Sequence, residues 1–162
     1  MGPKDVIRKS MATADFTINS YLGDLTDEEL RLVPVEGMQP IARQIGHLIV
    51  AERMFQEMLE PGSAPALPEG FDKAHSLKEN LGDSSGYRTK DEYLALWKQQ
   101  RDAIQALLDR IPDAELDSTR DGKLPPWAPT VCDVLNMVGL HSLMHAGQFV
   151  AVRRKLNKPV SF

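Results

Sequence analysis

The sequence has few of the features that would tie it to a membrane, a nucleic acid or an oxidising compartment. Cys132 is the only cysteine, so no disulfide can form within the chain, and we expect a reducing, cytoplasmic environment. No run approaches the roughly 18 apolar residues of a transmembrane helix. The chain carries 19 basic and 23 acidic residues, for a net charge of −4. An acidic chain lacks the basic surface that attracts nucleic acids or anionic lipids, so we expect neither as a partner.

Several sequence signatures of catalysis are also missing. The chain has no phosphate-binding loop, no dinucleotide fingerprint, no Ser/His/Asp arrangement and no H-E-x-x-H motif. It also lacks a convincing pair of β-strands and any internal repeat. Its 162 residues suit one domain with a core large enough to fold unaided. We therefore predict a single all-α domain over residues 1–162, whose function depends on individual side chains.

Apolar periodicity and end signals predict four long helices. Thr89 and Thr130 are the capping residues of the third and fourth, and Gly23 is expected to end the first in a left-handed conformation. Each helix carries one apolar stripe, which is typical of a helical bundle. The predicted ranges are 3–23, 40–60, 89–111 and 130–156.

Proline and glycine mark the connections between these helices. Thr26 begins a capping box and predicts a short helix to about Leu32. Residues 61–88 are rich in both breakers, with a short helix expected near Lys73 to Leu81, and their length makes them a candidate lid or partner surface. Because this connection and residues 112–129 are long enough to cross the bundle, the order of the helices around it stays open.

The strongest candidate for function is a group of three histidines. His141 and His145 are four residues apart on the predicted fourth helix, about 40° apart around its axis, so both rings can reach one metal ion. His47 lies on the apolar stripe of the second helix. Three neutral imidazoles converging from two helices would leave a coordination position open for water or substrate. Imidazole suits zinc, nickel, copper and iron, so the residues alone leave the metal open.

Other polar side chains share these stripes. Gln44 and Gln148, each about one turn from a candidate ligand, are expected to orient an imidazole or a bound molecule. Arg43 either meets an anionic substrate or is solvated. His75 lies in the long connection, outside any periodic stripe, and we predict that it is solvated. The competing interpretation is that the three core-facing histidines only satisfy hydrogen bonds in the core.

The residues around His47 and the segment from His141 to Gln148, with its His-x-x-x-His-x-Gly-Gln pattern, resemble the DinB-like (YfiT-related) superfamily. The closing Leu-Asn-Lys-Pro, with Asn157 where many relatives have glycine, is similar to the family's end of its last helix. This resemblance implies a four-helix bundle of up-down-down-up topology, often a homodimer. It also implies a divalent metal, commonly zinc or nickel, held by His47, His141 and His145.

The resemblance also bears on activity. Characterised members of the family include transferases and isomerases that use a low-molecular-weight thiol. We therefore expect a metal-dependent enzyme acting on a small molecule, with thiol transfer as the first reaction class and metal-assisted hydrolysis as the second. The alternative is a non-catalytic, stress-associated bundle that binds a metal or a small ligand. No general base is evident in the sequence, so the pattern does not decide between these functions.

Overall fold

The computed structural model describes residues 1–79 and 82–160, and these residues are all-α with no strand, which confirms the predicted fold class. The four long helices are α1 (Pro3–Leu22), α3 (Ile41–Leu59), α5 (Lys90–Arg110) and α6 (Val131–Lys155). The connections contain α2 (Asp27–Leu30), α4 (Phe71–Ala74) and two 3₁₀ turns, Asp113–Glu115 and Arg120–Gly122. None of the described helices combines the length and the apolar character needed to cross a membrane.

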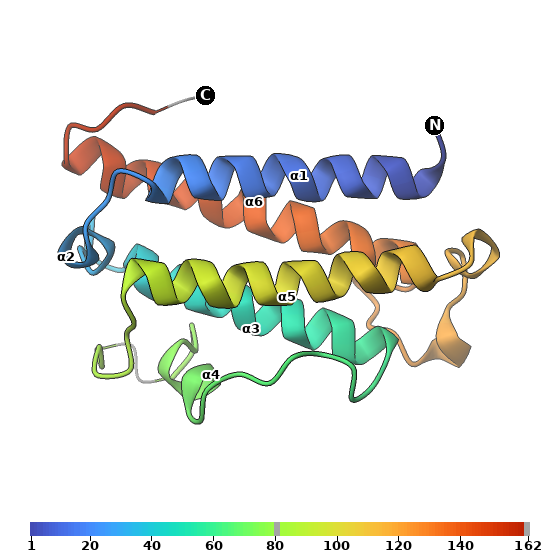
Figure 1. Cartoon of the computed structure of the whole chain (residues 1–162). Helices are drawn as coiled ribbons and strands as arrows, with labels where there is room; N and C mark the ends of the chain where they lie inside the picture. Colours follow the sequence, from blue (N-terminus) through green and yellow to red (C-terminus); the bar gives the residue numbers. More distant parts are fainter. Residues whose placement is uncertain (80–81, 161–162) are drawn as a thin grey trace.

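The four long helices lie side by side in a bundle (Figure 1). Helices α1 and α6 run in one direction, and α3 and α5 run in the opposite direction. Helix α6 packs against α1 and α3, while α5 packs against α3 and less extensively against α1. Because α3 and α5 are parallel neighbours, residues 60–89 must return along the whole bundle, which explains the length of that connection. The connection after α5 instead stays at one end, contrary to the expectation that both would span the bundle.

Three of the helices begin as the sequence predicts. Thr26, Thr89 and Thr130 each accept a hydrogen bond from the backbone N–H three residues on, which satisfies a donor that the first helical turn leaves free. The end of α1 differs from the prediction, because Gly23 keeps right-handed helical angles (φ −55°, ψ −39°). At the end of α6 the left-handed conformation does occur, at Asn157 (φ 55°), which follows the C-cap residue Leu156.

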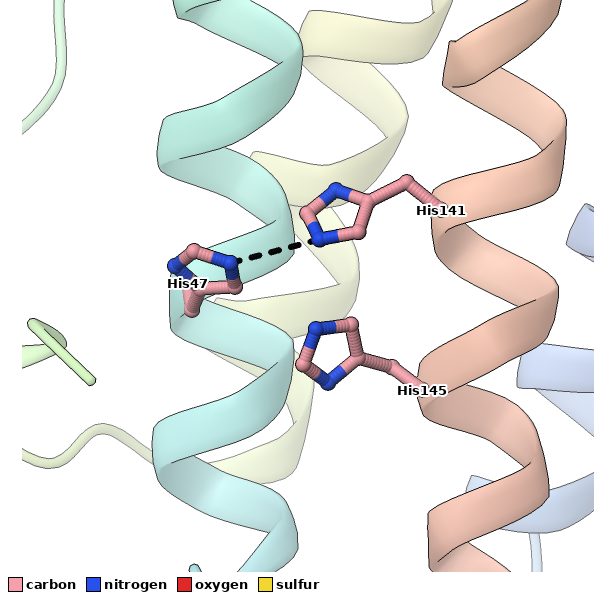
Figure 2. A group of neighbouring side chains, drawn as sticks. All are labelled: His47, His141 and His145. Atoms are coloured by element: carbon pink, nitrogen blue, oxygen red, sulfur yellow. Dashed lines mark hydrogen bonds between the residues drawn. The ribbon is translucent and has the colours of Figure 1, made fainter. Parts of the chain in front are cut away.

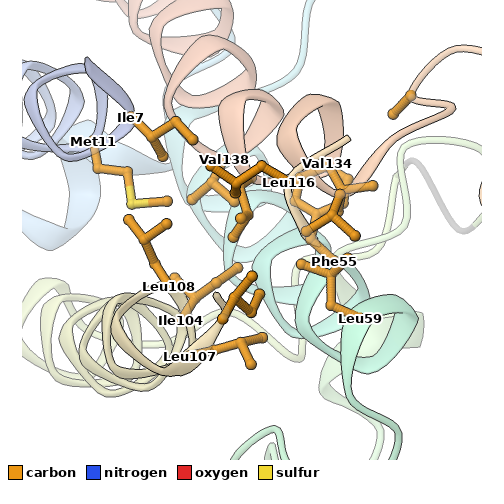
Figure 3. Close-up of a cluster of buried hydrophobic side chains, with 14 of the residues drawn as sticks. Ile7, Met11, Phe55, Leu59, Ile104, Leu107, Leu108, Leu116, Val134 and Val138 are labelled. Carbon is orange, nitrogen blue, oxygen red and sulfur yellow. The ribbon is translucent and has the colours of Figure 1, made fainter. Parts of the chain in front are cut away.

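The apolar core falls into two clusters, one towards each end of the bundle. The first, drawn in Figure 3, joins residues such as Met11, Phe55, Ile104 and Val138. The second includes Ile18 and other buried side chains of all four long helices, among them Ile45, Tyr93, Trp97 and Phe149. A polar side chain occupies the level between the clusters on each long helix; those of α3, α5 and α6 are buried, and that of α1, Asp15, is partly buried.

That polar layer is organised around Arg101. Its guanidinium pairs with the buried carboxylate of Glu52, lies 3.3 Å from Asp15 and donates to the hydroxyl of Ser142 at 3.3 Å. Ser142 in turn donates to the carbonyl of Val138. Arg101 and Glu52 are almost fully buried, so each relies on the other to offset its lost hydration. The layer therefore links all four long helices at the middle of the bundle.

His75 is the largest departure from the sequence expectation in the long connection. It is 1% exposed rather than solvated, because its ring lies against Phe71 and its Nε2 contacts the Tyr93 hydroxyl at 2.7 Å. The helix expected near residues 73–81 is α4, which starts earlier and has only four residues; residues 80 and 81 lie outside the described part. Glycine at position 46 gives the ring its space, since a Cβ there would lie 2.0 Å from a ring carbon of His75.

This contact leads to a prediction for Gly46→Ala. The added methyl group collides with a ring held by hydrogen bonds at both nitrogens, so we expect a loss of about 1–3 kcal/mol in the free energy of unfolding. Urea unfolding followed by circular dichroism measures it. The matched control is Gly147→Ala in α6, where a Cβ meets nothing within 4 Å and the higher helix propensity of alanine should stabilise the protein. Equal effects of the two substitutions would contradict the prediction.

Candidate metal centre

The structure brings His47, His141 and His145 together at the contact between α3 and α6. Figure 2 shows His47 reaching across from α3 towards the two rings that project from consecutive turns of α6. The ring centroids are 4.9–5.2 Å apart in all three pairs. One nitrogen from each ring lies within 4.8 Å of the others. The predicted convergence of the three side chains is therefore present in the fold.

The separation of the nitrogens suits a shared metal ion. The Nε2 atoms of His47 and His141 are 3.4 Å apart. Two nitrogens bound tetrahedrally to zinc at its usual bond length of about 2.05 Å are about 3.3 Å from each other. The three ligand nitrogens lie within 4.8 Å of one another, so binding of one ion by all three rings requires His145 to move closer to the other two. Among the described residues no further histidine, cysteine or carboxylate completes the group, so a bound ion would keep a position open.

Gln44 fixes the orientation of His145. The side-chain Oε1 of Gln44 lies 2.9 Å from Nδ1 of His145, and its Nε2 donates to the carbonyl of Gln39 at 2.8 Å. The amide is thereby oriented with its oxygen towards the ring, so Nδ1 of His145 carries the proton. The lone pair of this imidazole is then on Nε2, which faces the other two rings. Gln44 sits where the sequence analysis expected it, next to the candidate ligands.

Burial keeps the three imidazoles neutral. It lowers the pKa of His47, and it lowers the pKa of His141 to about 4 with a further contribution from His47. The pKa of His145, which is 5% exposed, falls to about 3 through burial and the two neighbouring rings. A metal ion binds the neutral form of imidazole, so near neutral pH no proton has to leave before coordination. The surroundings of the rings therefore favour metal binding.

The same shifts predict how the metal-free protein responds to acid. In the unfolded chain histidine titrates near 6.5, whereas in the fold His141 and His145 stay neutral down to about pH 4 because their pKa values are lowered. Below pH 6.5 the unfolded state therefore binds more protons, and the free energy of unfolding should fall as the pH drops from 6.5 towards 4. Urea unfolding between pH 7 and 5 measures this slope. The variant His141→Gln/His145→Gln should have a flatter profile, and an equal slope in both proteins would contradict the assignment.

The cluster is open to solvent on one side and bordered by aromatic rings on another. His47 and His141 are only partly buried, so a small molecule can reach them. Phe55 lies 6.1 Å from the ring of His141 and 6.0 Å from Trp127, which is 54% exposed. The sequence analysis did not identify Phe55 as part of the site, although its place two turns after His47 on α3 is consistent with that position. Phe55 thus borders His141, and Trp127 is a neighbour of Phe55.

The expectation for Arg43 is wrong, and the one for Gln148 is met only in part. Arg43 is fully buried, and its guanidinium donates to the carbonyls of Ser76, Glu79 and Asp83, so it holds the long connection against α3 instead of meeting a substrate. Gln148 has an exposed side chain and makes no hydrogen bond to the three imidazoles among the described residues. A contact between Gln148 and a bound molecule stays a prediction.

The α3 stripe on which His47 lies is also less buried than the sequence suggests. Met54, which lies on the same stripe as His47, is 42% exposed, and Val50 is half-buried. This part of α3 faces the connection to α5, which covers the helix incompletely. His47 therefore lies at the edge of the core.

Comparison with known protein families identifies one match. The sequence profile of the DinB superfamily matches residues 17–149, a range that includes all three histidines and covers most of the chain. No curated protein and no solved structure matches the chain significantly. The match thus supports the family resemblance noted from the sequence, and it includes the site described above.

Proposed function

This chain belongs to the DinB superfamily, and we propose that His47, His141 and His145 bind one divalent metal ion, zinc or nickel, at which a small molecule reacts. The proposal rests on one observation, the convergence of three neutral imidazoles whose nitrogens lie within 4.8 Å of one another. Three imidazoles alone leave at least one coordination position for a reactant, whereas structural zinc sites normally have four protein ligands.

We propose thiol transfer as the reaction, with a low-molecular-weight thiol as co-substrate and an electrophilic small molecule as acceptor. A bound ion supplies Lewis-acid chemistry, lowering the pKa of a coordinated thiol or water into the neutral range. The protein side chains have separate tasks. Gln44 holds His145 in the tautomer that presents Nε2, and Phe55 places an apolar ring beside His141. Metal-assisted hydrolysis is the second reaction class.

A non-catalytic metal-binding function is the alternative, and one feature of the site favours it. Among the described residues, the cluster has no carboxylate or thiol that could transfer protons. Glu52, the buried carboxylate of the polar layer at the middle of the bundle, is paired with Arg101. Any proton transfer would then depend on the substrate or on solvent. A homodimer and a cytoplasmic location stay predictions.

A screen for metal-dependent thiol transfer tests the catalytic proposal. The protein is loaded fully with zinc or nickel and incubated with low-molecular-weight thiols and electrophiles, and loss of free thiol is followed. We expect turnover that requires both the metal and His141, so His141→Ala should be inactive. Absence of turnover with every thiol at full metal occupancy would exclude thiol transfer and favour the non-catalytic alternative.

A further inference from the structure

A cavity separate from the imidazoles lies between α3 and the connection that follows it. Its volume is about 420 Å³, which is large enough for part of a small organic molecule. Val50 and Met54 of α3 form one wall, and Ala66 and Leu67 of the connection form the other. These walls are apolar. The charged groups at the cavity are those of Arg53 and Asp72.

The cavity lies next to the candidate metal centre along α3. Val50 and Met54 follow His47 by three and seven residues, which places them within about 60° of it around the helix. Arg53 is six residues beyond His47, a rise of about 9 Å along the helix axis and about 120° around it, and its side chain nevertheless lines the same cavity as Val50 and Met54. A molecule that contacts Arg53 in the cavity can therefore extend along the Val50–Met54 wall towards the imidazoles.

Arg53 is the polar group of this cavity that lacks a complete set of partners. Its Nε is buried and makes no hydrogen bond among the described residues. Its nearest carboxylate oxygen, on Glu57, is 3.9 Å away. Both oxygens of Glu57 are engaged elsewhere, because they accept hydrogen bonds from the backbone N–H groups of Gly62 and Ala64. Nε itself is out of reach of a ligand, but the side chain is 43% exposed, so its terminal N–H groups can hydrogen-bond a carboxylate.

The carboxylate of Asp72 opposes the binding of an anion in the cavity. Its carboxylate accepts a hydrogen bond from the backbone N–H of Lys73, at the start of α4, and no ion pair joins it to Arg53 among the described residues. Its negative charge weakens the attraction of the cavity for an anion. Removing that charge should therefore strengthen anion binding, whereas removing the charge of Arg53 should weaken it.

We propose that this cavity binds the carboxylate end of the substrate or thiol co-substrate, with Arg53 as the group that recognises it. The molecule is elongated and apolar in the middle, and it is long enough to cover the rise of about 9 Å along the helix axis between Arg53 and His47, so that its reactive end reaches the three histidines. This inference rests on the proposed function for the reactive end alone. Recognition of the carboxylate by Arg53 does not require the metal.

The test uses two probes that differ at one end only. One is a straight-chain mercaptoalkanoate of roughly eight carbon atoms, a length that spans the distance from Arg53 to His47, and the other is the mercaptoalcohol of equal length. Binding of both is measured by calorimetry, on the zinc-loaded and on the metal-free protein. We expect the carboxylate to bind about tenfold more tightly than the alcohol.

Substitutions at the cavity should alter this preference. Arg53→Gln should reduce the tenfold preference to less than about twofold, and Asp72→Asn should increase it. Ala66→Trp, at an exposed position of the cavity wall, should block both probes in the metal-free protein. Arg154→Gln, at an exposed arginine of α6, is the matched control and should change nothing.

The outcomes separate the two proposals. If the protein binds no zinc but the metal-free form still prefers the carboxylate through Arg53, the cavity assignment holds and the proposed function fails. If the zinc-loaded protein binds both probes equally and Arg53→Gln has no effect, the cavity assignment is overturned and the metal centre is untouched. Comparable effects of Arg53→Gln and Arg154→Gln would likewise reject a specific role for Arg53.

Discussion

Replacing His145 by alanine is expected to lower the affinity of the protein for zinc by more than about a hundredfold. That figure is the upper end of the loss seen when only a hydrogen-bonding partner of a ligand is removed, and here a ligand itself is lost. Wild-type protein should hold about one ion per chain after incubation with zinc and gel filtration, measured by elemental analysis, and the variant should hold almost none. Competition with a chromophoric chelator gives the affinities.

His75 and Gln44 provide the controls for this experiment. His75→Ala removes a buried imidazole that lies outside the cluster, so this variant should still bind zinc if it stays folded by circular dichroism. Gln44→Leu leaves all three ligands but removes the acceptor for Nδ1 of His145, and we expect an intermediate loss of about 10–100-fold. Wild-type protein that takes up neither zinc nor nickel would show that the three histidines are core residues and would remove the basis for the proposed function.

Replacing Arg101 by methionine is expected to lower the free energy of unfolding by about 3–5 kcal/mol. Methionine fills a similar volume, but the change leaves the carboxylates of Glu52 and Asp15 without their cation at the middle of the bundle. Burial raises the pKa of Glu52, and Arg101 opposes that shift. Without Arg101 the carboxyl group would take up a proton, so the loss should be greatest at pH 8 and smaller at pH 5. Urea unfolding at both pH values measures it.

Arg110 is a matched control on the same helix. It pairs with Glu60 at the surface, where both side chains are about half exposed and water screens the interaction, so Arg110→Met should cost far less stability. The double variant Arg101→Met/Glu52→Leu removes both charges of the buried pair and should recover part of the loss. A loss for Arg101→Met no larger than that for Arg110→Met would show that the polar layer contributes little to stability.

Most of the helix boundaries could be predicted from the sequence, because they depend on neighbouring residues. The capping box from Thr130 to Asp133 places the start of α6 through contacts that span three residues. The same holds for Thr89 at α5 and Thr26 at α2. Gly23 was predicted less well, since glycine permits a left-handed conformation without requiring one. Local physics therefore fixed which segments are helical and the approximate residues at which they begin.

The environment of His75 and Arg43 could not be predicted in the same way. Both are polar residues whose burial depends on partners that are distant in the sequence: Tyr93 for His75, and three carbonyl groups after α4 for Arg43. Periodicity describes one helix at a time and carries no information on how a connection folds back over it. The predictions from the sequence were therefore least accurate for residues 61–88.

The sequence by itself determined the all-α fold, the helix starts and the three histidines on apolar stripes, because each follows from spacing along a single helix. Only the tertiary structure decided that His47 meets His141 and His145, since this requires α3 and α6 to be neighbours in the matching register. It also decided that Arg101 neutralises Glu52 and that Arg53 borders a cavity with its Nε unpaired. The histidine contacts and the Arg101–Glu52 pair join residues at least 49 positions apart, and the cavity at Arg53 depends on a connection without helical periodicity. Burial in these contacts sets the charge and the chemistry of each group.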